Sequence, residues 1–297
     1  MDKLDILQIE RLIRISKEKP LDADSFVPWG QPFGVEEIYL PENLVSLAGL
    51  GMYETLSGEQ KNELARLELI QVMYSYCWSE GLFCTFMNRY ILDLPSDNIE
   101  RRFLIRELIE EYKHQEMFGR AIETLGGKPI AVNGFQRIAG NFTARYMPDG
   151  ILFLACITIE MMADRYGDVI RKDLGCYSVI RKVSELHNIE EARHILFTKA
   201  LLKRYTENMN PLKASWYSLI VLMNIRLFQD TYVKKEIYER IGLADSKGIR
   251  RVAFRNYQRK FAEDCLGTVV ELVKGFGGFN GFTRLIWRYV LKITVNH

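Results

Sequence analysis

Four glutamates lie where a helix that faces a protein core would carry apolar side chains. Glu80, Glu111 and Glu160 each continue a stripe of apolar residues spaced by three or four positions, which form one face of a helix. Glu191 continues a similar stripe together with two histidines. A carboxylate buried without a partner is strongly unfavourable, so a chain that buries four of them needs compensating cations. A fold in which these faces meet around metal ions satisfies that need.

The histidines of the chain gather at the same positions. Three of the four lie in, or one helical turn before, two segments that read Glu-Glu-x-x-His, at 110–114 and 190–194. Residues three apart share one side of a helix, so each segment can direct a carboxylate and an imidazole at one metal ion. Two divalent cations would balance four carboxylates and neutral histidines. The predicted ligands are Glu80, Glu111, His114, Glu160, His187, Glu191 and His194.

Position along the helices also bears on the role of His187 and suggests roles for two further side chains. His187 lies one turn before Glu191 and can reach the same metal, although a histidine on an apolar face is often an ordinary core residue. Glu110 and Glu190 each precede a predicted ligand and can accept a hydrogen bond from a ligating histidine, the alternative being a glutamate that faces solvent. No separate acid or base stands out, so the predicted catalytic groups are the metal ligands themselves.

The periodicity of apolar residues predicts helices along almost the whole chain, which indicates an all-α fold. The ligand-type residues fall on four long helices in the order Glu, Glu/His, Glu, Glu/His, as in ferritin-like four-helix bundles. We therefore expect one domain, 1–297, with a bundle core at about 57–208, an N-terminal arm at 1–56 and additional flanking helices at 211–297. The expected helices span about 5–19, 57–92, 95–126, 149–173, 178–208, 211–241 and 245–274, with a last one ending near Thr294.

Two segments lack a clear helical pattern. Residues 20–41 are rich in Pro and Gly and predict a meandering arm. Residues 128–150 carry Gly and Pro at both ends and predict a loop or a broken helix. The second segment is long enough to form a lid or a wall beside an access route.

Composition and charge argue against several classes of partner. Forty basic residues against 38 acidic give a net charge of +2, so the sequence predicts no nucleic-acid partner. No stretch reaches the roughly 18 uncharged apolar residues that a membrane span requires, and the first residues do not begin an apolar signal segment. Five cysteines without a C-x-x-C pair indicate a reducing compartment. We expect a cytoplasmic protein with no membrane partner.

The ligand pattern resembles that of the p-aminobenzoate N-oxygenase family of arylamine oxygenases. That family reads Glu, then E-x-x-H, then Glu, then H-x-x-x-E-x-x-H, and all seven positions occur here in order, within a similarity that spans 66–203. The resemblance implies two bound iron ions, with manganese or a mixed Mn/Fe pair left open, and O2 as co-substrate. It further implies a non-haem di-iron oxygenase that forms a peroxo intermediate and oxidises an amine to hydroxylamine, nitroso or nitro in a biosynthetic pathway.

The sequence defines the substrate site less well than the metal site. Apolar side chains near the predicted ligands could line a pocket for an amine, although core packing is the ordinary role of each. A substrate carboxylate could be held by Arg145, Arg165 or Arg193, which could instead form structural salt bridges. The candidate pocket residues are Tyr76, Phe83, Met87, Phe118, Phe153 and Tyr166.

We expect the electrons to come from another protein. The sequence contains neither a dinucleotide-binding glycine motif after a strand nor the cysteine spacing of an iron–sulfur protein. The expected partners are therefore a ferredoxin or a reductase and a small-molecule amine, and a homodimer is left open. Two other functions also stay open. One is a di-iron enzyme that hydroxylates, desaturates or cleaves a C–H or acyl substrate, and the other is a non-catalytic metal-binding helical bundle.

Overall fold

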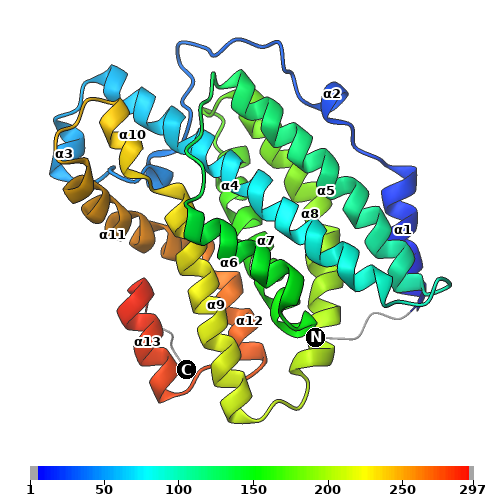
Figure 1. Cartoon of the computed structure of the whole chain (residues 1–297). Coiled ribbons are helices and arrows are strands. Elements are labelled where there is room, and N and C mark those ends of the chain that lie inside the picture. Colours follow the sequence, from blue (N-terminus) through cyan, green and yellow to red (C-terminus); the bar gives the residue numbers. More distant parts are fainter. Residues whose placement is uncertain (1–5, 294–297) are drawn as a thin grey trace.

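Four long helices form the centre of this computed structural model, which describes residues 6–293. α4 packs against α5, and α7 packs against α8 (Figure 1). Contacts between α5 and α8 and between α4 and α7 close the bundle. The expected all-α, ferritin-like architecture is confirmed, because no β-strand occurs within residues 6–293. The four core helices are α4 (Gly58–Leu92), α5 (Ile99–Thr124), α7 (Asp149–Lys172) and α8 (Ser178–Thr206).

The remaining helices flank this bundle. α1 (Ile6–Glu18) packs on α5, and α9 (Pro211–Tyr232) packs on α7 and α4. One continuous cluster of buried apolar residues extends from Ile9 of α1 to Leu291 near the end of the described chain. The other helices are α2 (Ala23–Phe26), the 3-10 helix η1 (Glu42–Leu44), α3 (Gly51–Glu54), α6 (Gly134–Tyr146), α10 (Lys235–Arg240), α11 (Ser246–Cys265), α12 (Gly267–Gly275) and α13 (Gly281–Leu291).

Side-chain caps fix where α4 and α5 begin. The Ser57 hydroxyl accepts a hydrogen bond from the Gln60 amide at 3.1 Å, and the Gln60 side chain accepts one from the Ser57 amide. This is the capping box that the sequence predicts for α4. α5 begins later than the expected position 95. The Asn98 side chain caps it, because its Oδ1 accepts a hydrogen bond from the Glu100 amide nitrogen at 2.7 Å.

Two of the predicted helices are each divided in two. The expected helix at 211–241 ends as α9 at Tyr232, where Val233 turns to an extended conformation. The expected helix at 245–274 is interrupted at Leu266, between α11 and α12. Val233 and Leu266 are both buried. The apolar pattern therefore continues through each break, and periodicity alone could not reveal it.

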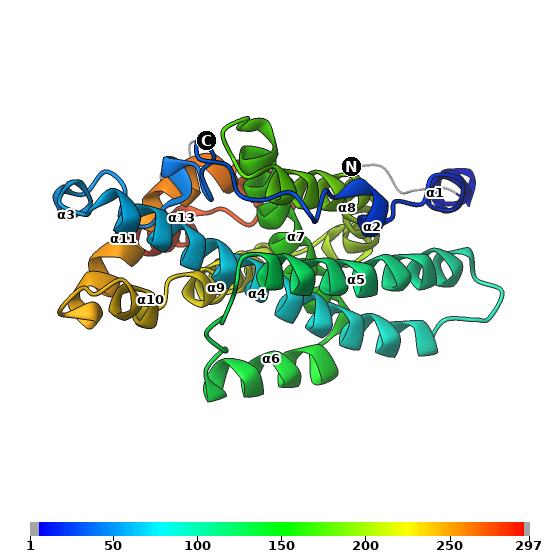
Figure 2. The same ribbon diagram turned by 90° about the horizontal axis from the view of Figure 1, so that it is seen from above.

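Part of the segment expected to be a loop or broken helix, 128–150, forms α6. Asn133 caps this helix, which lies along the outer side of α4 (Figure 2). Gly140 allows the close approach, because a Cβ at this position would lie 2.8 Å from Leu82 Cδ1 and 2.9 Å from Trp78 Cζ2. α6 therefore forms a wall over this face of α4.

The cysteines and the helix lengths relate to two expectations from the sequence, a reducing compartment and no membrane partner. All five cysteines are free thiols, and three of them are buried. Within the described residues, no helix combines the length and the apolar character needed to cross a bilayer. The predicted helix ends at Asp5 and Thr294 lie outside the described residues.

Glu68 of α4 is a buried carboxyl group outside the bundle centre. Its side chain accepts a hydrogen bond from the Ser46 amide at 2.9 Å and another from the Ser46 hydroxyl. Burial raises the pKa of Glu68 to about 7, because the opposing effects of the Ser46 hydrogen bonds and of Lys260 are smaller. The folded chain therefore holds a proton that the unfolded chain releases at lower pH.

We expect the free energy of unfolding to fall as the pH rises from the ordinary glutamate pKa of 4.5 to about 7. The folded state binds the Glu68 proton more tightly across this range, and the loss approaches about 3 kcal/mol. Glu68→Gln keeps hydrogen-bonding groups opposite Ser46 but has no titrating proton. Urea unfolding at about pH 5 and about pH 8 should show a smaller decline for this variant. An equal decline in both proteins would contradict the assignment.

Candidate metal centre

Each core helix turns its predicted ligands toward the interior of the bundle. The side chains come from α4, α5, α7 and α8, and every one of them is buried. Glu160 is the most exposed at 7%, so water does not solvate these groups. The structure brings together all the predicted ligands, namely Glu80 on α4, Glu111 and His114 on α5, Glu160 on α7, and His187, Glu191 and His194 on α8.

Glu111 and Glu191 lie at the centre of the cluster. Glu191 Oε1 is 3.4 Å from His114 Nδ1, 3.3 Å from His194 Nδ1 and 3.5 Å from His187 Nε2. Glu111 has one oxygen 3.5 Å from His114 Nδ1 and the other 3.0 Å from His194 Nδ1. Each of these carboxylates faces imidazoles from both α5 and α8.

The ligand-type atoms form three overlapping groups. Within each group the atoms all lie within 4.8 Å of one another. His187 belongs to two of the groups, and its Nε2 is 3.3 Å from Glu80 Oε1. Because the groups share members, the cluster offers neighbouring positions for more than one cation. The groups are Glu80, His114 and His187; Glu111, Glu191 and His194; and Glu160, His187 and Glu191.

Many atoms that face this centre have no hydrogen-bond partner among the described residues. They are both oxygens of Glu111 and of Glu191, Oε2 of Glu80, and Nδ1 of His114 and of His194. Buried polar atoms left unpaired are costly, and bound cations would satisfy them. Carboxylate and imidazole donors suit iron or manganese. The residues present therefore fit a pair of metal ions.

The two histidines of the Glu-Glu-x-x-His segments are oriented by glutamates of the opposite helix. His114 Nε2 of α5 lies 2.8 Å from Glu190 Oε2 of α8, and His194 Nε2 of α8 lies 2.8 Å from Glu110 Oε2 of α5. Both glutamates are buried, so the alternative of a solvent-facing side chain is wrong. These crossed pairs leave each Nδ1 directed at the carboxylate centre.

Glu110 also connects the centre to the N-terminal helix. It accepts a hydrogen bond from the Ser16 hydroxyl of α1 at 2.6 Å and one from Arg193 at 2.9 Å. His187 has different surroundings, since its ring stacks on Tyr76 at 6.0 Å between ring centroids. The third histidine is thus positioned by aromatic packing.

The pKa values of His114 and His187 are shifted in opposite directions. Burial by itself would lower the pKa of His114, but Glu111 and Glu190 raise it to about 10. Burial lowers the pKa of His187 to about 4. Burial would raise the pKa of Glu110, but the hydrogen bond from His194 is the main reason that it falls to about 2. His114 therefore holds a proton that a metal ion would have to displace.

Glu80 and Glu160 show the cost of gathering carboxylates without cations. Burial raises the pKa of both well above the ordinary value, and neighbouring carboxylates raise it further. The uncharged forms of both groups are therefore favoured as long as no cation lies beside them. Divalent cations supply that charge and allow the carboxylates to ionise.

Glu107 is a buried carboxyl group that the sequence reasoning missed. It lies one helical turn before Glu111, is 1% exposed, and neither oxygen has a hydrogen-bond partner among the described residues. Burial raises its pKa, and the charge of His194 acts in the opposite direction. The signal was available, because Glu107 shares a helix face with Glu111 at four-residue spacing.

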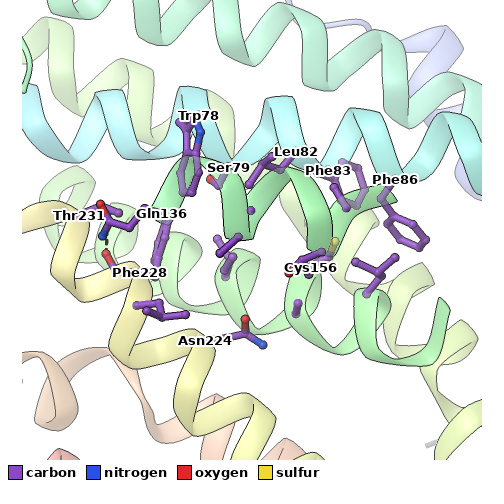
Figure 3. Close-up of a pocket in the computed structure, with 18 of the residues that line it drawn as sticks. Trp78, Ser79, Leu82, Phe83, Phe86, Gln136, Cys156, Asn224, Phe228 and Thr231 are labelled. Carbon is purple, nitrogen blue, oxygen red and sulfur yellow. Dashed lines mark hydrogen bonds between the residues drawn. The ribbon is translucent and has the colours of Figure 1, made fainter. Parts of the chain in front are cut away.

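A separate apolar cavity of about 140 Å³ lies between α4, α6, α7 and α9. Trp78, Leu82 and Phe83 of α4 form one side, and Asn224 and Phe228 of α9 lie across from them (Figure 3). The predicted ligand Glu160 also lines this cavity. The cavity therefore reaches the edge of the metal centre.

Only one of the six predicted pocket residues lines this cavity. Phe83 does so, whereas the other five are buried core residues outside its lining. Tyr76 illustrates the reason, because its ring packs against His187 and Phe118 in the core. Helical periodicity identifies apolar faces but not which of them borders an open space. The five residues that do not line the cavity are Tyr76, Met87, Phe118, Phe153 and Tyr166.

None of the three predicted arginines lines the cavity. Arg193 pairs with Glu110 at 2.9 Å, beside the metal centre. Arg165 lies 3.5 Å from Asp168 on its own helix, and Arg145 is exposed on α6. Arg193 and Arg165 therefore form structural salt bridges, the alternative to binding a substrate carboxylate.

A second cavity approaches the metal centre beneath the N-terminal arm. Its volume is about 170 Å³, and His114 and Glu190 line it together with Trp29, Lys113 and Arg120. Polar and charged groups thus line the cavity beside the His114–Glu190 pair, in contrast to the apolar cavity at Glu160.

A four-helix bundle that directs buried carboxylates and imidazoles at one another defines a ferritin-like metal protein of the carboxylate class. The family described as p-aminobenzoate N-oxygenase AurF matches residues 7–277, and the chain belongs to that family. The family consists of di-iron oxygenases of the ferritin-like kind. Uncharacterized proteins of Mycobacterium bovis and Mycobacterium tuberculosis are each 21% identical over 244 residues, which cover 80% of this chain and 71% of theirs.

We expect the double substitution Glu110→Gln and Glu190→Gln to weaken metal binding by about 10- to 100-fold. Both crossed pairs lose their charged acceptor, so the rings of His114 and His194 are no longer held with Nδ1 inward. Titration of the metal-free protein with Mn2+ measures the affinity. Glu123→Gln, an exposed change on α5, is the matched control. Equal affinities for the double variant and the control would exclude an orienting role.

Proposed function

We propose that the protein is a di-iron N-oxygenase that transfers an oxygen atom from O2 to the nitrogen of a small amine. The observation that carries the proposal is the buried cluster of four glutamates and three histidines, in which inward atoms of Glu80, Glu111, His114, Glu191 and His194 lack partners among the described residues. The family match supports an oxygenase, and the cavity at Glu160 supports a small organic substrate.

The residues of this chain have distinct roles in that reaction. Glu80, Glu111, Glu160, Glu191 and the three histidines would hold two iron ions, which supply O2 activation when bound. The four carboxylates offer eight oxygens and would balance the charge of the two ions. The crossed pairs orient two imidazoles, and the surrounding apolar residues keep water away from the reacting nitrogen.

The stoichiometry requires a source of electrons. Conversion of R–NH2 with O2 to R–NHOH and water consumes two electrons and two protons: one oxygen atom forms the N–O bond and the other leaves as water. We propose that a ferredoxin or a reductase supplies the electrons, in line with the absence of flavin-type and iron–sulfur motifs from the sequence. Further oxidation to the nitroso or nitro level would repeat this chemistry.

We expect purified protein from iron-replete cells to contain about two metal ions per chain, since four carboxylates need that charge. Elemental analysis measures the content and distinguishes iron from manganese. Glu191→Ala should lose at least one ion, because this carboxylate touches all three histidines. Full metal content in the variant would overturn the ligand assignment, and a metal-free native protein would favour a non-catalytic bundle.

Reaction of the reduced, metal-loaded protein with 18O2 and an aniline should give an N-oxygenated product that carries one heavy oxygen per N–O bond. Mass spectrometry identifies it. A medium-chain fatty acid tested in parallel should be recovered unchanged. Hydroxylation, desaturation or cleavage of the fatty acid, with no product from the aniline, would replace N-oxygenation by the alternative chemistry on an acyl substrate.

His187→Ala should leave the fold intact but change the absorption spectrum that develops when the reduced, metal-loaded protein is mixed with O2, or the rate at which that spectrum decays, because one nitrogen donor to the metal would be removed. Circular dichroism checks the fold, and stopped-flow absorption follows the spectrum. Lys182→Ala, a change at a half-exposed position on α8, is the control. A spectrum and a decay rate identical to those of the unchanged protein would remove His187 from the ligand set.

A further inference from the structure

α6 exposes its large apolar side chains instead of burying them. Phe135, Ile138, Phe142 and Tyr146 are between 56% and 72% exposed. Their spacing of three, four and four residues places them on one stripe along the helix. Only two of the 13 residues of α6 are buried. A helix on the surface of a globular protein normally directs its apolar stripe at the core, so the stripe on α6 needs another explanation.

α9 carries a second exposed stripe. Four large apolar side chains, spaced by four, seven and four residues, lie on one side of this helix and are at least 39% exposed. α6 and α9 meet where Gln136 Nε2 donates to Asp230 Oδ2 at 3.1 Å, and the two helices diverge from there (Figure 1). The exposed residues of the α9 stripe are Leu212, Trp216, Met223 and Leu227.

Both stripes border the apolar cavity. Phe135 of α6 and Leu227 of α9 belong to the cavity lining, and each is also exposed at the surface. The cavity therefore opens to the surface beside these two residues, and its inner boundary includes Glu160. Large exposed apolar patches on a protein mark contacts with a partner or with lipid. The mouth of the cavity thus lies within a surface suited to such a contact.

The charged groups on α6 are all basic. The helix contains Arg137 and Arg145 and no Asp or Glu. Both arginines are exposed, and neither forms an ion pair with another residue in the part of the chain that the structure describes. Asp149 follows α6 and Asp230 lies near the end of α9, but each of these acids is paired with an arginine. The surface around the stripes therefore keeps unneutralised positive charge.

This combination favours an anionic lipid surface over a second copy of the chain. A helix with an apolar stripe and basic polar residues can lie in the plane of a lipid surface, with the basic groups at anionic headgroups. A two-fold dimer through the same patch would face Arg137 and Arg145 with another α6 that has no acid to meet them. The sequence predicts no membrane partner because no segment can span a bilayer, but an interfacial helix needs no spanning segment.

We propose that the face formed by the exposed stripes of α6 and α9 binds an anionic lipid surface, with the mouth of the apolar cavity turned toward the lipid. This interaction goes beyond the proposed oxygenation and does not depend on it. A cavity that opens onto lipid would admit an apolar molecule directly from the lipid, without transfer through water.

Sedimentation of the metal-loaded protein with lipid vesicles tests the proposal. Vesicles of phosphatidylcholine mixed with phosphatidylserine should bind the protein at least about tenfold better than phosphatidylcholine alone, and added salt should weaken the binding. Ile138→Ser combined with Phe142→Ser should lower binding at least about tenfold, because two side chains no longer enter the apolar layer. Arg137→Gln combined with Arg145→Gln should remove most of the preference for the anionic vesicles.

α13 supplies a matched control, because it also exposes large apolar side chains but does not line the cavity. Leu285→Ser combined with Tyr289→Ser should leave vesicle binding unchanged, and circular dichroism checks that every variant keeps the fold. Brominated lipids test the part played by α9. They should quench a smaller fraction of the tryptophan fluorescence in Trp216→Phe, because Trp216 is the most exposed tryptophan of the described chain.

Absence of binding to the anionic vesicles would overturn the proposal, as would an equal loss of binding in the α6 and α13 variants. A dimer that Ile138→Ser and Phe142→Ser convert to a monomer in analytical ultracentrifugation, with vesicle binding unchanged, would assign this face to a second copy of the chain. If the vesicles bind as expected and anilines are not N-oxygenated, the lipid-binding face stands and the proposed function fails.

Discussion

Repulsion between carboxylates in a buried interior is the constraint on which the rest of the structure depends. Four core helices each present an acidic side chain to the same small volume, where low dielectric strengthens every charge interaction. The crossed pairs bury Glu110 and Glu190 as well, and Arg193 lies beside both of them. α1 takes part through Ser16. The flanking helices thus help to enclose a centre that is stable only when cations offset its charge.

The sequence was sufficient for the bundle and for the groups that meet at its centre. Glutamates such as Glu80 and Glu160 stand out because each interrupts an otherwise apolar stripe, and the i, i+3 spacing of Glu191 and His194 places both on one face. The capping box at Ser57 likewise depends only on local chemistry. These features are encoded within single helices, which is why a single sequence reveals them.

Features that depend on how helices cover one another could not be obtained in the same way. Tyr76 and Phe83 both lie on apolar positions of α4, yet only Phe83 borders the cavity, because α6 and α9 decide where space is left open. Asn224 lies far along the chain from every predicted ligand and joins the cavity only through the packing of α9. The sequence predicted that Glu110 and Glu190 accept hydrogen bonds from ligating histidines. Only the tertiary structure shows that each glutamate pairs with the histidine of the opposite helix, α5 or α8.

That exchange also restricts how the two helices can move. A slide of α5 along α8 by one turn, about 5.4 Å, would separate His114 from Glu190 and His194 from Glu110 at the same time. Inserting one residue within either motif would rotate its histidine by about 100° relative to its glutamate. The reciprocal contacts therefore fix the axial register of α5 against α8. Tolerated changes in helix length are confined to the regions outside the two motifs.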